Sequence, residues 1–136
     1  MKTLDIYLFF AGKCEEALTF YKQCLNGEIT MFKRFKDEPT LDVPAEYADH
    51  VMHAEFKAGD LFFMASDGMP GQSHKLGDNI HLNIQCDSIE QQDRIFQALA
   101  KGGTVSKALE ETFWGSRFGM LTDQYGIHWM LSCDLQ

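Results

Sequence analysis

The sequence predicts an α+β fold of two βαβββ modules that form a curved mixed sheet around a cleft. Hydrophobic periodicity gives the same order of elements, one strand, one helix and three strands, twice along the chain. A shift of 75 residues lays the first half on the second without a gap from residue 6 to residue 28. The 136 residues, 45% of them hydrophobic, can bury a core without disulfides. We therefore expect a single domain over residues 1–136, with module one at about 1–67, a linking loop at about 68–78 and module two at about 79–136.

The first half begins with an apolar, β-prone segment that ends at Ala11 and Gly12. Apolar residues then recur at spacings of three and four, which is the pattern of a helix with one buried face. Asn26 and Gly27 follow, and these residue types favour the conformation that caps the C-terminus of a helix. Three further β-prone segments complete this half. The predicted strands cover residues 4–10, 28–35, 51–57 and 61–65, and the helical stripe consists of Ala17, Leu18, Tyr21, Cys24 and Leu25.

The second half begins with an alternating segment, residues 79–86, whose apolar and polar side chains lie on opposite faces. Asp87 and Ser88 follow, and a serine N-cap supported by Glu90 or Gln91 predicts the start of a helix. A glycine pair ends this helix, and three strand-like segments come after it. The polar face of the first strand carries His81, Asn83 and Gln85, the helical stripe consists of Ile95, Phe96 and Leu99, and the later strands cover residues 104–109, 118–122 and 127–133.

The composition restricts the partners and the location of the protein. The formal charge is −8, from 20 acidic and 12 basic residues, which argues against a nucleic acid because a phosphate backbone requires clustered Lys and Arg. No apolar run is long enough to span a membrane, and the N-terminus lacks a secretory signal pattern. The four cysteines form no CxxC pair and fit buried thiols in a reducing compartment. We expect a cytoplasmic protein without a nucleic-acid or membrane partner.

Three stretches of the sequence together resemble a known family. They are residues 7–12 with Glu16-Ala17-Leu18 and Phe20-Tyr21, then Met64-Ala65-Ser66-Asp67 with Met69-Pro70-Gly71, and finally Glu111-Thr112-Phe113-Trp114-Gly115 with Phe118-Gly119, Asp123, Tyr125-Gly126 and Trp129. The pattern is similar to PhnB-like proteins of the vicinal-oxygen-chelate superfamily, which includes glyoxalases, bleomycin-resistance proteins and extradiol dioxygenases. The resemblance implies paired βαβββ modules, a concave site for a small molecule, and a homodimer.

Enzymes of that superfamily hold a divalent ion with side chains from the first and last strands of each module. The resemblance places these positions at Ile6, His81, near Phe63 and near Met130. Only His81 has a ligating side chain, and one imidazole does not hold a divalent ion usefully. We therefore expect no metal or other cofactor. The alternative is a rebuilt divalent-metal site, whose candidate ligands are His53, Glu55 and His81, with His128 as a fourth.

The candidate ligand-binding residues lie on polar strand faces and in one loop. His53 and Glu55 alternate with apolar neighbours, so they share a face, which is either ligand-binding or simply exposed to solvent or a dimer partner. The residues expected at the ligand are His81, Asn83, Gln85, His53, Glu55 and Trp114, the last as a lid residue in a loop. Three others have structural expectations: Trp129 in the core, Asp123 shaping a turn, and Arg117 as a solvated charge.

Two functions of different classes fit these residues. The first is a metal-free protein that binds a small molecule, with a polar strand face next to an aromatic-rich region. The second is a metal-dependent lyase, isomerase or dioxygenase that uses the rebuilt ligand set. Some PhnB-like relatives carry the label of a ubiquinone-precursor methyltransferase, but no glycine-rich nucleotide loop follows the first strand here, so we do not expect that activity.

Overall fold

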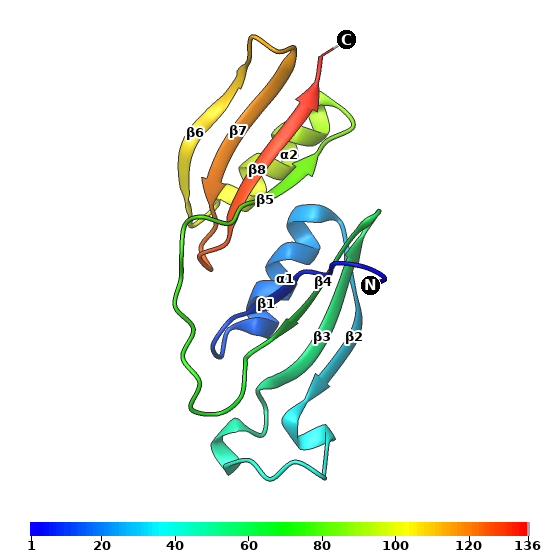
Figure 1. Ribbon diagram of the computed structural model, residues 1–136, viewed down its shortest axis with the longest axis vertical. Coiled ribbons are helices and arrows are strands. Elements are labelled where there is room, and N and C mark those ends of the chain that lie inside the picture. Colours follow the sequence, from blue (N-terminus) through cyan, green and yellow to red (C-terminus); the bar gives the residue numbers. More distant parts are fainter. Residues whose placement is uncertain (136) are drawn as a thin grey trace. The chain divides into compact units, whose positions relative to one another are not determined.

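The computed structural model describes residues 1–135, and the chain divides into two compact units, Met1–Lys75 and Leu76–Gln136. Each unit consists of a helix packed on a four-stranded mixed sheet, in the chain order strand, helix and three strands (Figure 1). The predicted α+β class with two βαβββ modules is therefore confirmed. Within the described residues, neither helix has the length and apolar character needed to cross a membrane.

The first unit has the sheet order β1-β4-β3-β2. β1 pairs in parallel with β4, whereas β4 with β3 and β3 with β2 are antiparallel pairs. The helix α1 covers one face of this sheet, and we call the opposite face the helix-free face. The elements are β1 (Tyr7–Phe9), α1 (Cys14–Leu25), β2 (Glu28–Arg34), β3 (Val51–Ala58) and β4 (Leu61–Ser66), with two short 3₁₀ helices, η1 (Phe35–Asp37) and η2 (Ala45–Tyr47).

The second unit repeats this arrangement with the sheet order β5-β8-β7-β6. β5 and β8 form the parallel pair, and the remaining pairs are antiparallel. The elements are β5 (Leu82–Gln85), α2 (Ile89–Ala100), β6 (Thr104–Glu111), β7 (Ser116–Thr122) and β8 (His128–Asp134). β5 is shorter than the predicted strand 79–86, because its pairing with β8 begins only at Leu82, opposite Trp129, and the chain before it is exposed, with Ile80 retaining 75% of its accessible surface.

The core of the first unit lies between α1 and the sheet. The helical stripe predicted from the sequence is buried except for Leu25 at its end, and Tyr21 meets the ring of Phe63 edge-on at 5.9 Å. Phe63 also stacks on Phe56 at 4.9 Å. Each aromatic side chain removed from water in this way stabilises the fold by about 1.5–3 kcal/mol. The side chains that alternate with this core set point to the helix-free face.

The two helices obtain their N-terminal caps in different ways. In α2 the Ser88 hydroxyl accepts a 3.1 Å hydrogen bond from the Gln91 N–H, and the Gln91 side chain accepts one from the Asp87 N–H, as the sequence predicted. In α1 the residue at the N-cap position is Lys13, whose side chain makes no cap. The acceptor is instead Asp67, which follows β4. Its Oδ1 accepts 2.8 Å hydrogen bonds from the N–H groups of Gly12 and Cys14, and its Oδ2 accepts one from Val51.

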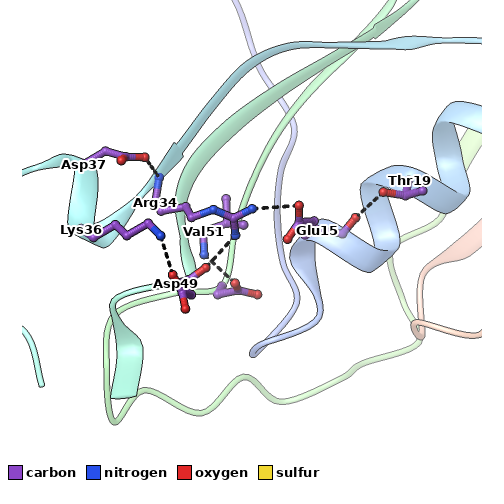
Figure 2. A network of polar contacts seen from close by, with 8 residues as sticks. Glu15, Thr19, Arg34, Lys36, Asp37, Asp49 and Val51 are labelled. Atoms are coloured by element: carbon purple, nitrogen blue, oxygen red, sulfur yellow. Dashed lines mark hydrogen bonds and ion pairs between the residues drawn. The ribbon is translucent and has the colours of Figure 1, made fainter. Parts of the chain in front are cut away.

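The irregular stretch 36–50 is closed at its base by ion pairs (Figure 2). Arg34 reaches Glu15 on α1 at 2.9 Å and the backbone oxygen of Asp49 at 2.8 Å, while its own N–H donates to Asp37. Lys36 pairs with the Asp49 carboxylate at 2.8 Å. Each exposed ion pair contributes only about 0.2–1 kcal/mol to stability. The ion pairs therefore supplement the backbone hydrogen bonds that join the two ends of the loop. The two ends of this loop are thus held together, and its C-terminal end is held to Arg34 of β2, which also pairs with Glu15 on α1.

Candidate functional site

The helix-free face of the first sheet carries polar, aromatic and thioether side chains in cross-strand rows. The register aligns Tyr7 of β1 with Met64 of β4, Met64 with Glu55 of β3, and Glu55 with Met31 of β2. Since directly opposite residues point to the same side of a sheet, these four side chains form one row. The next row contains Phe9, which is opposite Ser66.

A continuous line of hydrogen bonds crosses this face. The Tyr7 hydroxyl lies 2.8 Å from His53 Nδ1, and His53 Nε2 lies 3.0 Å from Glu55 Oε2. A carboxylate can only accept, so the proton of the neutral imidazole is on Nε2. Nδ1 is then an acceptor, and the Tyr7 hydroxyl donates to it. Burial raises the pKa of the Tyr7 phenol, and a hydrogen bond with Ser66 partly offsets this, so the phenol is neutral and remains a donor.

Apolar groups surround this polar line. The Tyr7 ring stacks on Phe9 at 5.0 Å, and Phe9 stacks on His74 at 4.7 Å. Tyr7 is 37% exposed and Phe9 42%, although aromatic side chains of this size are mostly buried in folded proteins. Met31 is exposed to the same degree as Tyr7. The face therefore combines hydrogen-bonding groups with solvent-accessible rings and thioethers, which is the composition of small-molecule sites.

The second unit has a pair of stacked imidazoles at the start of β5 and β8. The rings of His81 and His128 lie 5.0 Å apart and are nearly parallel. Their Nε2 atoms donate to backbone oxygens of the preceding linker, His81 to Asp78 at 3.0 Å and His128 to Gly77 at 2.7 Å. Both Nδ1 atoms are then acceptors. Thr122 donates to that of His128 at 2.7 Å, whereas the buried Nδ1 of His81 has no hydrogen-bond partner among residues 1–135.

The other predicted ligand residues occupy different settings in the second unit. Asn83 and Gln85 alternate with the less exposed Leu82 and Ile84, which confirms the predicted polar face of this strand. Asn83 Oδ1 accepts a 3.0 Å hydrogen bond from Ser132 on β8. Trp114 lies between β6 and β7 and is 60% exposed, with Phe113 edge-on to it at 4.9 Å.

The residues present do not fit the divalent ion of the superfamily. His53 and Glu55 are neighbours, but both ring nitrogens of His53 already have partners. In the described part of the chain, no three His, Cys, Asp or Glu side chains are grouped so that they could hold a metal ion. A stable site for such an ion needs three or four convergent donors.

Trp129, Asp123 and Arg117 have the structural settings that follow. Trp129 is 1% exposed, and Asp123 accepts hydrogen bonds from the N–H groups of Tyr125 and Ile127 and from the Trp129 indole, so both expectations are confirmed. The expectation for Arg117 is wrong. Its guanidinium pairs with Asp93 on α2 at 2.8 Å, because β7 directs it toward the helix rather than into solvent.

The predicted shift of 75 residues between the two halves holds for the helices but is wrong for the first strands. The helices begin at Cys14 and Ile89, which is a shift of 75, but Tyr7 corresponds to Asn83 on the helix-free faces, which is a shift of 76. A one-residue slip moves a side chain to the opposite face. Ile6 therefore belongs to the face covered by α1, as does Phe63, and the helix-free positions near Phe63 are held by Phe62 and Met64.

Tyr7 and Phe9 lie on the candidate face but were not among the ligand-binding residues predicted from the sequence. Their segment reads as an apolar run, Tyr-Leu-Phe-Phe, in which no polar residue marks one face. The one available signal was the hydroxyl of Tyr7, which usually needs a partner when the ring lies against other side chains.

Comparison with known proteins connects these features with a family. Residues 2–132 match the family described as 3-demethylubiquinone-9 3-methyltransferase. Protein YjdN of Escherichia coli is 32% identical over 95% of this chain and 93% of its own length. The crystal structure of PA1353 from Pseudomonas aeruginosa is 36% identical, with a TM-score of 0.84 over 98% of this chain and 100% of that one. A PhnB protein from Bacillus cereus is 27% identical, with a TM-score of 0.80 over 97% and 99% of the two chains.

More distant structures share the fold alone. A glyoxalase/bleomycin resistance protein/dioxygenase family enzyme from Burkholderia phytofirmans is 17% identical, with a TM-score of 0.64 over 97% of this chain and 100% of that one. The two βαβββ units are thus the arrangement found in glyoxalase/bleomycin-resistance proteins.

Proposed function

We propose that this chain, which belongs to the PhnB-like 3-demethylubiquinone-9 3-methyltransferase family, is a small-molecule-binding protein that acts without the divalent metal ion of the wider superfamily. The observation that carries the proposal is the hydrogen-bonded line Tyr7–His53–Glu55 among exposed rings and thioethers on the helix-free face of the first sheet. A face of this kind offers a ligand both apolar contact and a few directed polar groups.

The geometry favours binding through side chains that are already oriented. His53 is fixed at both ring nitrogens, so its orientation does not have to be acquired when a ligand arrives. Asp67, at the end of β4, accepts a hydrogen bond from the Gly12 N–H just beyond β1. This bond and the pairing of β1 with β4 fix the strand that carries Tyr7 and Phe9. The methyltransferase description is not transferred to this chain, because no glycine-rich nucleotide loop follows its first strand.

The buried Nδ1 of His81 supports a ligand contact in the second unit as well. A buried acceptor without a partner costs about 1–3 kcal/mol, and a hydrogen-bond donor on a ligand would remove that cost. We include His81, Asn83, Gln85 and Trp114 among the proposed ligand-binding residues on this basis and on their polar or exposed positions.

The proposal is tested by amide NMR with indole as a neutral aromatic probe. We expect saturable shifts at the amides of Tyr7, Phe9, His53 and Glu55, and a loss of these shifts in the Tyr7→Ala variant. Val105→Ala is the control, because it removes an exposed apolar side chain from β6 in the second unit. Shifts that are absent, or that lie only elsewhere, would refute binding at this face.

In the metal-dependent alternative, a lyase, isomerase or dioxygenase with a rebuilt ligand set, His53 would have to exchange one of its present hydrogen bonds, to Tyr7 or to Glu55, for the metal ion. Measuring the metal content of protein purified without chelators distinguishes this alternative from our proposal. Stoichiometric Zn, Ni, Mn or Fe that disappears in His81→Ala or His53→Ala would establish the alternative. We also propose that the protein is a cytoplasmic homodimer; light scattering on the purified chain tests the oligomeric state, and cell fractionation tests the location.

A further inference from the structure

We infer that the ligand of the helix-free face is an organic cation, an ammonium group attached to an aromatic or otherwise apolar body. This inference rests on the proposed function and specifies the class of molecule that is bound. It follows from which atoms on this face can still form hydrogen bonds, from the charges around them, and from the rings beside them.

The free hydrogen-bonding capacity at the centre of the face consists of acceptors. The single Tyr7 proton is directed at His53 Nδ1, and the Nε2 proton of His53 is directed at Glu55. What remains is the lone pair of the Tyr7 oxygen that its hydrogen bond with Ser66 leaves free, and the acceptor capacity of the Glu55 carboxylate, whose side chain is 35% exposed. A group that donates several hydrogen bonds and accepts none, such as an ammonium, fits this arrangement better than a carboxylate or a phosphate does.

The surrounding charges favour a cation too. The nearest lysine in the register is Lys33, opposite His53, and its ammonium is held 2.8 Å from Glu38. The next lysine, Lys57, is directly opposite Glu28. The three carboxylates of Glu28, Glu38 and Glu55 therefore outnumber the two lysines on and beside this face, within a chain whose formal charge is −8.

The apolar groups of the face can hold the body of such a ligand. The rings of Tyr7 and Phe9 remain partly accessible, although Phe9 stacks on both Tyr7 and His74, and their exposed surface offers apolar contact to the body of the ligand. The thioethers of Met31 and Met64, in the same row as Glu55, are adaptable apolar surfaces. A compound in which a short linker joins a ring to an ammonium group can place the ring against Tyr7 and Phe9 and the ammonium at Glu55.

The experiment compares three probes that share one ring system: tryptamine, which is cationic, indole, which is neutral, and indole-3-propionate, which is anionic. Binding is measured by amide NMR titration on the whole chain. We expect tryptamine to bind about 10-fold more tightly than indole-3-propionate, and Glu55→Gln to remove most of that preference while indole binding changes less than about 2-fold. Asp60→Asn is the matched control, since it removes the same charge from the exposed β3–β4 turn.

Each outcome of this experiment decides between the two proposals. If indole binds at this face but tryptamine and indole-3-propionate bind equally, or if Glu55→Gln leaves the preference intact, the inference of a cationic ligand is overturned and the proposed function stands. If Asp60→Asn removes the preference as strongly as Glu55→Gln does, the preference reflects diffuse charge, and the inference is overturned as well. If none of the three probes binds at this face, both proposals are refuted.

Discussion

Replacement of Asp67 by alanine is expected to lower the free energy of unfolding by about 4 kcal/mol. The carboxylate is 7% exposed and accepts three backbone hydrogen bonds of 2.8 Å, from Gly12, Cys14 and Val51. Hydrogen bonds to a charged group contribute about 1.5–3 kcal/mol each, so simple addition gives about 4.5–9 kcal/mol. Gly12 is exposed, and water can replace the carboxylate there, which reduces the expected loss to about 4 kcal/mol.

The asparagine variant separates hydrogen bonding from side-chain size. In Asp67→Asn the one remaining oxygen can still accept from Gly12 and Cys14, but the amide nitrogen then faces the N–H of Val51, where two donors meet. We expect a loss of about 2 kcal/mol, which is half that of Asp67→Ala.

Urea unfolding followed by far-UV circular dichroism measures both losses. With a slope of about 2 kcal/mol per molar urea, the midpoint should fall by about 2 M for Asp67→Ala and about 1 M for Asp67→Asn. Asp60→Ala, in an exposed turn, is the control and should stay within about 0.5 kcal/mol of the parent. A loss below about 1 kcal/mol for Asp67→Ala, or equal losses for the two variants, would show that this carboxylate does not anchor the unit as we argue.

Three further predictions concern other parts of the chain. Gly103→Ala should lower the free energy of unfolding by several kcal/mol in thermal or urea unfolding, because the added Cβ would meet a backbone carbonyl at the end of β7. In the control Gly71→Ala the added Cβ meets nothing within 4 Å, so the loss should be about 1 kcal/mol, from backbone strain alone. Burial raises the pKa of Cys86 to about 11, so iodoacetamide at pH 8 should leave this thiol unmodified until urea unfolds the chain, and fast labelling of the folded protein would contradict its burial. Hydrogen bonding to Lys33 lowers the pKa of Glu38 to about 2. The ion pair of these two residues therefore contributes to stability above the ordinary carboxyl pKa, and this contribution is lost as the pH falls toward 2. An NMR titration of Glu38 should give a midpoint near that pKa, and Lys33→Ala should return the midpoint toward the ordinary carboxyl value.

Features of the fold that depend on neighbouring residues could be predicted from the sequence. The cap of α2 is formed by Ser88 and Gln91, three positions apart, and the serine pattern predicted it correctly. The polar face of β5 follows from simple alternation, so the positions of Asn83 and Gln85 were also predicted. Such features need only the local periodicity of helices and strands.

Features that depend on contacts distant in the sequence could not be predicted. The cap of α1 comes from Asp67, which is 53 positions beyond Cys14, and nothing near Lys13 indicates it. Likewise, the contact of Tyr7 with His53 spans 46 positions and depends on the register of three strands. The one-residue difference between the shifts of the helices and the strands has the same origin, because only the paired sheet fixes which face a strand residue occupies.

The remote capping of α1 also has a consequence for the order in which the first unit can form. As the chain leaves the ribosome, α2 can acquire its N-terminal acceptor as soon as Ser88 and Gln91 have been made, whereas α1 must wait until Asp67 has emerged and β4 has paired with β1. Until then we expect the start of the first helix to fray and its first amides to exchange with solvent. We therefore expect the N-terminal turn of α1 to become stable late in the synthesis of this half, once Asp67 is available.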